Sequence, residues 1–386
     1  MPTPPVRKNL PAGLAELFVF ALALIFALYV RYAFRSYLTS DYDSFTSLWY
    51  QAVKEQGFAA AGTAVSNYTP PYMYLLYLTS VALPKLAPVI AIKVPSILFD
   101  FFCAWFVFRI VQLKYQGLRM PLFAAMAVLL APTVVSNSGI WGQADSIYAS
   151  MLLACVYFVM TGRGAVAAVA FGMALSFKFQ AMFLAPAMCV LLLKRVVPLW
   201  TVVLVPLVYA LVMVPAWLAG RPAWDLATVY LTQSVTYHSL SKNAPNFYLW
   251  LPDRFYTPAV LGGLLLTVAA GCVYLWSAWK SKVKLDQGLI LQLCLLSLIM
   301  APFLLPKMHD RFFYPADVLA IAYGFFFPRQ YYVPIAVSFA SFFAYQPFLA
   351  RLEVVPLKLL PIVMLVAFVA VALSTRRSLR GSPEVT

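Results

Sequence analysis

The sequence predicts an all-α polytopic membrane protein with about twelve transmembrane helices, and three observations support this class. Hydrophobic residues make up 63% of the 386 residues and charged residues only 11%, whereas a soluble domain is about 45–50% apolar and about 25% charged. The apolar residues form continuous runs, which excludes the alternating pattern of a membrane β-barrel. Lys and Arg gather in short segments between these runs, as in the cytosolic loops of membrane proteins.

The runs follow one another without an internal repeat or a linker, so we expect a single transmembrane domain covering residues 1–386. The first run follows Arg7 and Lys8, but it is too long for a signal peptide and no small-residue cleavage site comes after it. We therefore treat it as a span. The predicted spans are 14–34, 89–112, 120–136, 147–160, 165–177, 181–193, 198–219, 257–279, 288–305, 314–327, 331–346 and 355–374.

Charged residues give these spans an orientation. Turns rich in Lys and Arg alternate with acidic loops, so we place the basic turns and both termini in the cytosol. This topology accounts for the formal net charge of +15 without nucleic acid as a partner. The basic turns are 114–119, 163, 194–195, 280–284, 329 and 376–380. The acidic residues on the extracytosolic face are Asp41, Asp43, Glu55, Asp145, Asp225, Asp253, Asp310 and Glu353.

The apolar stretch Tyr72–Leu86 is predicted to lie in the extracytosolic interface. If it crossed the membrane, every later loop would change sides and the basic turns would lie outside. An amphipathic helix with prolines at its start satisfies the same residues without crossing. The first extracytosolic loop then runs from about 35 to 88 and holds two interfacial helices, near 45–56 and 72–83.

Two carboxylates, Asp41 and Asp43, lie where the first span meets water. Such a pair is suited to acid–base chemistry at a membrane surface. The alternative is that they solvate a loop or cap a helix that begins near Phe45. A third carboxylate, Asp100, lies within a span, with Lys93 about two turns earlier. We interpret Asp100 as an interhelical polar contact.

Two cationic segments are predicted to face an anion. Lys178 lies between two apolar runs that are each shorter than the roughly 20 residues of a span. A short hairpin there would place the ammonium group below the membrane surface, facing an anion or a water-filled cavity. Lys307, His309 and Arg311 fall within one short loop and suit a phosphate group. The alternative for this second segment is an anchor that contacts lipid headgroups.

Two aromatic motifs on the same face each have a structural alternative. Trp141–Gly142–Gln143–Ala144–Asp145 ends at the start of a span, where Asp145 either caps the helix or joins Asp41 around one site. Asn67–Tyr72 is rich in Tyr and Pro. It forms either an interfacial belt or a wall that stacks against a sugar or shapes the entrance for the lipid. His238 stands alone in a long loop, and we interpret it as structural.

Taken in order, these motifs resemble the GT-C glycosyltransferases, specifically the bacterial branch related to GPI mannosyltransferase II. The resemblance covers residues 38–315, and Asp310 stands where the family pattern has Glu. The matching segments are Asp41–Tyr42 with Trp49–Tyr50, Tyr68 with Pro70–Pro71–Tyr72, Trp141–Gly142–Gln143–Ala144–Asp145, Phe177–Lys178–Phe179–Gln180 and Lys307–Met308–His309–Asp310–Arg311–Phe312–Phe313.

The resemblance implies an inverting transfer of a sugar, mannose or another hexose, from a polyprenyl-phosphate carrier to a hydroxyl of a glycan, lipid or protein. It implies a GT-C fold in a bacterial inner membrane, with the active site on the periplasmic side. Asp41 would be the base, with Asp43 the second candidate. Some members of the family use a divalent cation and many do not. If one binds here, Asp41 and Asp145 are its expected ligands.

The remaining motif residues receive roles by the same resemblance. The predicted contacts to the donor phosphate are Lys178, Lys307, His309 and Arg311. The predicted contacts to the sugar or the acceptor are Tyr68, Tyr72, Trp141, Gln143, Asp145 and Gln180.

The main alternative is a polytopic transporter or a flippase for a lipid-linked sugar, because ionisable residues inside a membrane also mark transport routes. A transporter would show charged residues spread through the spans and an internal repeat. Here the ionisable residues cluster on one face and no repeat is visible. A non-catalytic scaffold would not require this clustering. The sequence therefore favours the enzyme.

Overall fold

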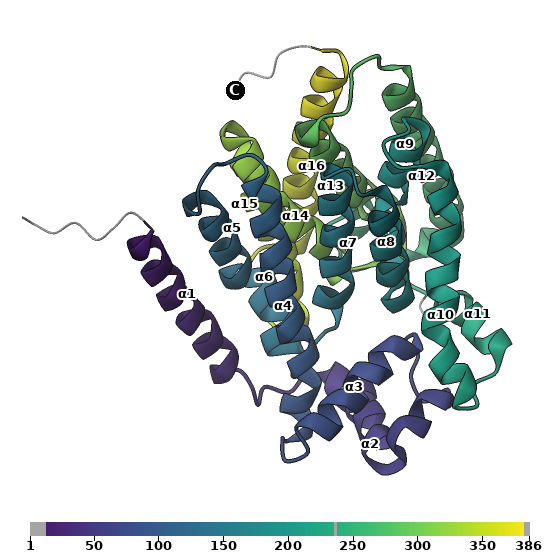
Figure 1. Ribbon diagram of the computed structural model, residues 1–386. Coiled ribbons are helices and arrows are strands. Elements are labelled where there is room, and N and C mark those ends of the chain that lie inside the picture. Colours follow the sequence, from purple (N-terminus) through teal and green to yellow (C-terminus); the bar gives the residue numbers. More distant parts are fainter. Residues whose placement is uncertain (1–12, 235–237, 382–386) are drawn as a thin grey trace, which may run out of the picture.

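A computed structural model describes residues 13–234 and 238–381, and these residues fold into a bundle of helices (Figure 1). Arg7, Lys8 and Glu384 lie outside the described residues. Within the described chain, seven helices are long and apolar enough to cross a membrane. They are α1 (Leu14–Ala33), α4 (Pro88–Gln112), α10 (Leu204–Leu218, extended by the 3-10 turn Leu199–Val203), α12 (Tyr256–Lys280), α13 (Gln287–Leu304), α15 (Tyr332–Leu349) and α16 (Leu360–Leu379).

The other apolar helices are bent or short. An eighth span forms if α5 (Arg119–Leu130) and the segment Pro132–Trp141, bent by 42°, are counted together. That segment contains α6 (Pro132–Val134) and a π-helix (Val135–Trp141). The short helices are α7 (Asp145–Met160), α8 (Gly164–Phe177), α9 (Ala185–Leu193) and α14 (Tyr314–Phe326). The all-α polytopic class is therefore confirmed, but the exact count of twelve spans is not, since these helices are shorter than about 20 residues.

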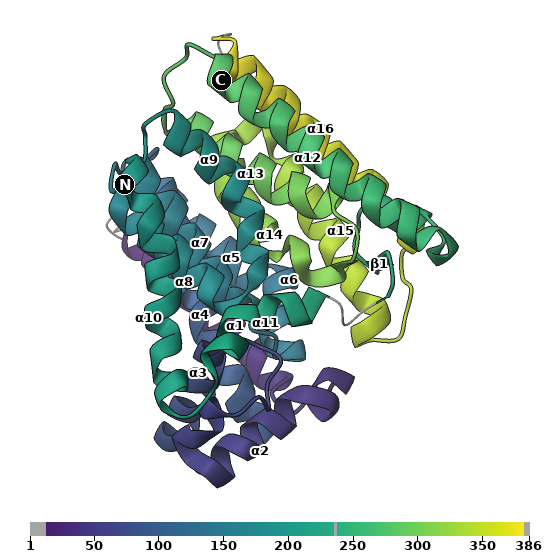
Figure 2. The ribbon, with the colours of Figure 1, turned by 90° about the vertical axis from the view of Figure 1, so that its right-hand side faces the viewer.

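Two helices of the first loop lie across one end of the bundle, as Figures 1 and 2 both show. They are α2 (Ser47–Gln56) and α3 (Pro70–Ala82), close to the positions predicted for interfacial helices. Proline at the first positions of α3 is favourable, because the main-chain N–H groups there have no partner inside the helix. A further short helix, α11 (Ala223–Ser234), lies in the loop that follows α10.

A two-stranded parallel ladder joins two loops that are far apart in the sequence. Strand β1 (Ser241–Lys242) pairs with β2 (Met308–His309), with Lys242 opposite His309. Asn243 forms an additional bridge to His309. The ladder therefore brings the loop after α11 against the cationic segment that precedes α14, and Figure 2 shows β1 near the end of α15.

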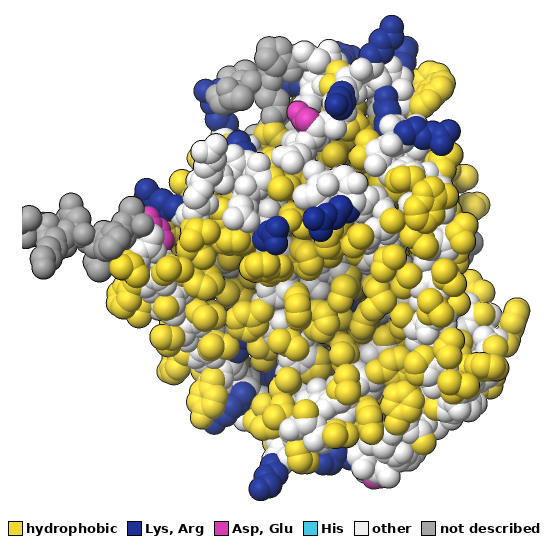
Figure 3. All heavy atoms as spheres, viewed as in Figure 1, with side chains coloured by type: hydrophobic (Ala, Val, Ile, Leu, Met, Phe, Trp, Pro, Cys, Tyr) yellow, Lys and Arg dark blue, Asp and Glu magenta, His cyan; other side chains and the backbone are white. Residues whose placement is uncertain are grey.

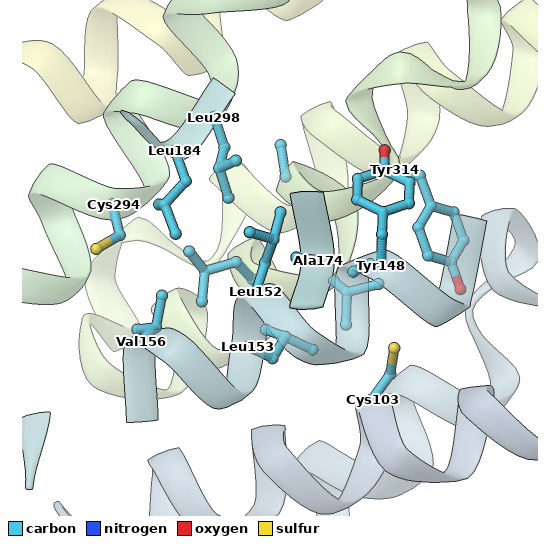
Figure 4. Packing of buried hydrophobic residues seen from close by; sticks show 14 of the residues in the cluster. Cys103, Tyr148, Leu152, Leu153, Val156, Ala174, Leu184, Cys294, Leu298 and Tyr314 are labelled. Atoms are coloured by element: carbon cyan, nitrogen blue, oxygen red, sulfur yellow. The ribbon is translucent and has the colours of Figure 1, made fainter. Parts of the chain in front are cut away.

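The core lies around α7 and α13, which are buried along nearly their whole lengths. Figure 4 shows Leu152 and Val156 of α7 packed near Cys294 and Leu298 of α13. The outer helices instead expose apolar side chains, which Figure 3 shows as a broad yellow surface around the middle of the molecule. Burial inside and apolar exposure outside are what a bundle in a bilayer requires, since lipid replaces water as the solvent.

Asp100 forms the interhelical contact that the sequence predicted, although its main partner is not Lys93. Its Oδ2 atom accepts hydrogen bonds from Nη2 of Arg31 at 2.7 Å and from Nε at 3.0 Å, which ties α4 to α1. Lys93 donates instead to the carbonyl oxygens of Phe34 and Tyr37, at 2.9 and 3.0 Å. Lys93 therefore fixes the chain between α1 and the first-loop carboxylates.

Candidate active site

A cavity of about 410 Å³ lies at the end of the bundle that carries α2 and α3. Five parts of the chain meet there: the first loop, the end of the π-helix before α7, the two loops joined by β1 and β2, and the end of α15. The residues around the cavity are Asp41, Phe45, Thr46, Trp49, Asn67, Tyr68, Trp141, Gln143, Ser239, Ser241, Lys242, Asn243, His309, Asp310, Arg311 and Phe348.

Asp41 is held in place by two donors from the motif that runs from Trp141 to Asp145. Its Oδ2 atom accepts a hydrogen bond from Nε1 of Trp141 at 2.9 Å and another from Nε2 of Gln143 at 2.7 Å. Both donors bind the same oxygen, which leaves Oδ1 to accept a proton. Asp41 precedes a π-helical turn, Tyr42–Thr46, but its side chain makes no capping hydrogen bond there. The capping interpretation of Asp41 is therefore wrong.

Asp43 occupies a different environment from Asp41. Its side chain is exposed and it does not line the cavity. Only one of the two predicted first-loop carboxylates therefore lies in the cavity.

Asp145 lies behind the cavity wall in a buried network of charges. Its Oδ1 atom accepts a hydrogen bond from Nζ of Lys178 at 2.6 Å, and its Oδ2 atom accepts one from Nδ2 of Asn137 at 2.8 Å. Nε of Arg311 lies 3.6 Å from Oδ2, close enough for an ion pair. Asp145 is the first residue of α7, but its side chain makes no capping hydrogen bond. Asp145 therefore links Lys178 to Arg311, which lies in the loop before α14.

Aromatic side chains form one wall of the cavity. The hydroxyl of Tyr68 hydrogen-bonds to Oε1 of Gln143 at 3.2 Å, and its ring lies 5.0 Å from that of Trp49. Tyr72 is almost fully buried behind Tyr68, with ring centroids 5.5 Å apart. Trp141 stacks on Phe348 at 4.4 Å. The rings of the wall thus pack against one another, and Tyr72 supports the wall without lining the cavity.

Three basic side chains line the same cavity as Asp41: Lys242, His309 and Arg311. Burial, together with the nearby charges of Arg311, Lys242 and Lys178, lowers the pKa of His309 well below its usual range. His309 is therefore neutral at neutral pH and offers hydrogen bonds rather than charge. The guanidinium of Arg311 lies 5.2 Å from the Trp141 ring, so it is close to the donors that hold Asp41.

Lys307 and Gln180, two other predicted contacts, do not line the cavity. The main-chain N–H of Lys307 donates to the carbonyl of Leu240 at 2.7 Å, and its Nζ atom lies 5.9 Å from the Tyr256 ring. Gln180 is half-buried in the 3-10 turn that follows Lys178. His238 contacts the same Tyr256 ring, at a centroid distance of 5.9 Å, in keeping with a structural role.

Lys242 and its neighbours in β1 are cavity residues that the motifs did not identify. Burial and the positive charge of Arg311 lower the pKa of Lys242, whereas Asp41 and Asp310 raise it. Its sequence signal was weak but present: Lys242 is a cation in a loop on the acidic face, against the overall distribution of Lys and Arg.

Asp310 is a buried carboxylate that faces the cavity, and burial raises its pKa to about 7. Arg311 opposes this shift, while Asp41 and Asp145 add to it. The folded protein then binds a proton on Asp310 more tightly than the unfolded chain does, so stability falls as the pH rises from about 4 to about 7. We expect Asp310→Asn to flatten the fall in unfolding temperature over this range. Equal slopes in the parent and the variant, measured in detergent, would exclude this role.

The described residues contain no group of three or more His, Cys, Asp or Glu side chains placed to hold a metal ion. Asp41 and Asp145, the two ligands expected from the sequence, accept hydrogen bonds from different donors. These contacts do not test whether the two carboxylates share a divalent cation, and that expectation stays a prediction.

The helices of this chain form a GT-C type fold. Among solved structures, the chain is similar to ArnT from Cupriavidus metallidurans in two states. With ArnT bound to undecaprenyl phosphate it shares 16% identity and a TM-score of 0.55, over 94% of this chain and 73% of that chain. With the apo state it shares 16% identity and a TM-score of 0.57, over 95% and 74%. The predicted GT-C fold is thus confirmed, while the narrower relation to GPI mannosyltransferase II stays a prediction.

No protein-family model and no curated protein sequence matches this chain.

Proposed function

We propose that this protein is an inverting glycosyltransferase that moves a sugar from a polyprenyl-phosphate carrier to an acceptor hydroxyl. The observation that carries the proposal is the position of Asp41. One oxygen of this carboxylate is fixed by Trp141 and Gln143, and it shares a cavity with Arg311 and Lys242. The reaction requires a base that accepts the proton of the acceptor hydroxyl and cations that stabilise the departing phosphate. This cavity holds both kinds of group.

In the proposed reaction the acceptor hydroxyl attacks the anomeric carbon of the sugar from the side opposite the carrier phosphate. Its oxygen forms the new glycosidic bond while the bond from the anomeric carbon to the phosphate oxygen breaks, which inverts the configuration. The hydroxyl proton passes to Oδ1 of Asp41, because a hydroxyl is a poor nucleophile until a base accepts its proton. The electron pair of the broken bond stays on the carrier phosphate.

The positive groups of the cavity stabilise that departing phosphate. Arg311 and Lys242 face it as cations, and His309 offers a neutral hydrogen-bonding ring. Fixed charges at the place where negative charge develops lower the barrier, because they are already oriented when the reaction occurs. Lys178 contributes from behind the wall, where it pairs with Asp145 and lies 4.9 Å from the Tyr68 ring.

The lipid carrier follows from the fold and from the membrane setting. ArnT holds undecaprenyl phosphate in a structure with the same fold, which supports a polyprenyl phosphate as the donor's carrier here. We propose mannose or another hexose as the sugar and a glycan, lipid or protein as the acceptor. A carrier of this kind keeps its tail in the bilayer and needs its phosphate at the membrane interface, so we propose that the cavity lies at that level.

The long apolar helices make this an integral membrane protein. We propose that it resides in a bacterial inner membrane with the cavity on the periplasmic side, because the opposite end carries the Lys and Arg turns. In intact cells, an impermeant thiol reagent should label Ser44→Cys, on the cavity side, and should not label Lys282→Cys. Both positions are exposed, and the parent, with its five native cysteines, is the control. Labelling of Lys282→Cys alone would show that the protein has the opposite orientation, with the cavity on the cytosolic side.

A panel of polyprenyl-phosphate sugars, each mixed with the purified protein and a crude envelope acceptor fraction, tests the proposed reaction. We expect free polyprenyl phosphate to appear with one donor or a few, detected by chromatography of the lipid fraction. Persistence of every donor in the panel, with the protein folded, would count against a glycosyltransferase with a polyprenyl-phosphate donor.

A further inference from the structure

A second cavity, of about 970 Å³, lies at the opposite end of the bundle from the candidate active site. It lies among the ends of α13, α14, α15 and α16, beside the turn that follows α4. The residues around it are Lys114, Val283, Asp286, Gly288, Leu289, Gln292, Phe326, Phe327, Pro328, Arg329, Gln330, Tyr332, Ala370, Leu373, Ser374, Arg377, Ser378 and Gly381.

The cavity has a built polar floor. The hydroxyl of Ser374 accepts hydrogen bonds from Nε2 of Gln292 at 3.0 Å and from Nε2 of Gln330 at 2.8 Å. The hydroxyl of Tyr323 in turn donates to Oε1 of Gln330 at 2.6 Å. Gln292 and Ser374 are buried among apolar helices. Buried amides are costly unless they are hydrogen-bonded. This network therefore fixes a polar surface inside the cavity, within a largely apolar bundle.

Three cationic side chains lie around the opening of the cavity, together with one acidic side chain that caps a helix. Lys114 donates to the carbonyl of Phe326, and the side chains of Arg329 and Arg377 are exposed. Asp286 accepts a hydrogen bond from the N–H of Leu289 at 2.8 Å and so caps α13. Figure 3 shows Lys and Arg side chains gathered around this end of the molecule. The opening therefore has an excess of positive charge.

The side walls are apolar, which distinguishes this cavity from a site for a soluble anion. Phe326, Phe327 and Tyr332 supply aromatic surface, and Ala370 and Leu373 of α16 supply aliphatic surface. A ligand that fits must combine a phosphate group for the Arg side chains, hydroxyl groups for the amide floor and an apolar part for the walls.

We propose that this cavity binds the headgroup of an anionic phospholipid from the adjacent leaflet, with phosphatidylglycerol as the matching chemistry. Its phosphodiester carries one negative charge and its glycerol headgroup carries hydroxyls. Basic pockets between transmembrane helices recognise such headgroups. The same phosphate chemistry is available from soluble phosphates, so the experiment separates the two sources.

The test measures lipid retention in nanodiscs that contain equal amounts of phosphatidylglycerol and phosphatidylcholine. The protein is released from the discs, and the lipids that stay bound are counted by native mass spectrometry. The test variant is Arg329→Gln with Arg377→Gln. The matched control is Arg163→Gln with Arg376→Gln, which removes two exposed arginines from the same end without touching the cavity lining.

We expect the parent and the control to retain phosphatidylglycerol over phosphatidylcholine, and the test variant to lose this preference by about tenfold or more, since two charge-assisted hydrogen bonds are removed. Unchanged retention in the test variant, or an equal loss in the control, would overturn the proposal. Displacement of the lipid by millimolar inorganic phosphate would assign the site to a soluble anion instead. If the double variant does not fold, Arg329→Gln alone is measured by the same criteria. Lipid retention is measured without sugar transfer, so the result tests the lipid site independently of the proposed reaction.

Discussion

Asp41→Asn should lower sugar transfer by about 10²–10⁴-fold, the usual cost of removing a general base. The amide keeps the size of the side chain, and its oxygen can still accept the hydrogen bonds from Trp141 and Gln143. It cannot accept the proton of the acceptor hydroxyl. Donor binding should therefore persist while turnover falls, and the two are measured separately, by binding of the labelled donor and by release of the carrier.

Asp43→Asn is the matched control, because it removes an exposed carboxylate two residues away that does not line the cavity. We expect its turnover to stay within a few-fold of the parent. A fully active Asp41→Asn beside an inactive Asp43→Asn would move the base to Asp43. Near-normal turnover in both variants and in the double variant would remove the first loop from the chemistry.

Lys178→Met should lower the free energy of unfolding by about 3–5 kcal/mol, because it leaves the carboxylate of Asp145 buried without its closest cation. The two side chains are 8% and 1% exposed and their charged atoms lie 2.6 Å apart. Arg311 at 3.6 Å and Asn137 at 2.8 Å are the contacts that Asp145 would keep. Denaturation in mixed micelles measures the change.

The double variant Lys178→Met with Asp145→Asn distinguishes the effect of Lys178 on stability from its effect on sugar transfer. Neutralising both partners removes the unpaired charge, so we expect most of the lost stability to return. Sugar transfer should stay low in the double variant if Lys178 also acts on the donor phosphate. Full stability in the single variant would mean that the pair contributes little, and full activity in the stable double variant would remove Lys178 from the site.

Much of the fold was predictable because it depends on composition and charge distribution. Continuous apolar runs can only become helices in a bilayer, where every main-chain polar group needs a partner within its own segment. The basic turns also placed Tyr72–Leu86 outside the spans, and α3 indeed lies across the end of the bundle. The number of spans was less predictable, because α7, α8 and α14 are shorter than a bilayer is thick and are packed inside the bundle.

The site was partly predictable, and the limit is set by long-range contacts. Asp41, Tyr68, Trp141 and Gln143 came from motifs whose order resembles a known family, and the structure brings them to one cavity. Lys242 reaches that cavity through a two-residue ladder between distant loops, for which a single sequence holds no periodic signal.

The two first-loop carboxylates illustrate the opposite limit. They are near-identical in sequence context, and a single π-helical turn separates their environments. Sequence alone therefore left the choice between Asp41 and Asp43 to the resemblance. The structure distinguishes them by the two donors on Oδ2 of Asp41 and by the exposure of Asp43.

The most direct measurement uses a donor with one isotope in the sugar and another in the polyprenyl carrier, reconstituted with the protein and its acceptor in vesicles. A glycosyltransferase breaks the bond between the two labels, whereas a flippase moves both across the bilayer together. We predict that the labels separate with the parent protein, with sugar recovered in the acceptor and carrier in the lipid, and that they stay joined with Asp41→Asn. Labels that stay joined in the parent, or that separate equally fast in Asp41→Asn, would contradict the proposed reaction.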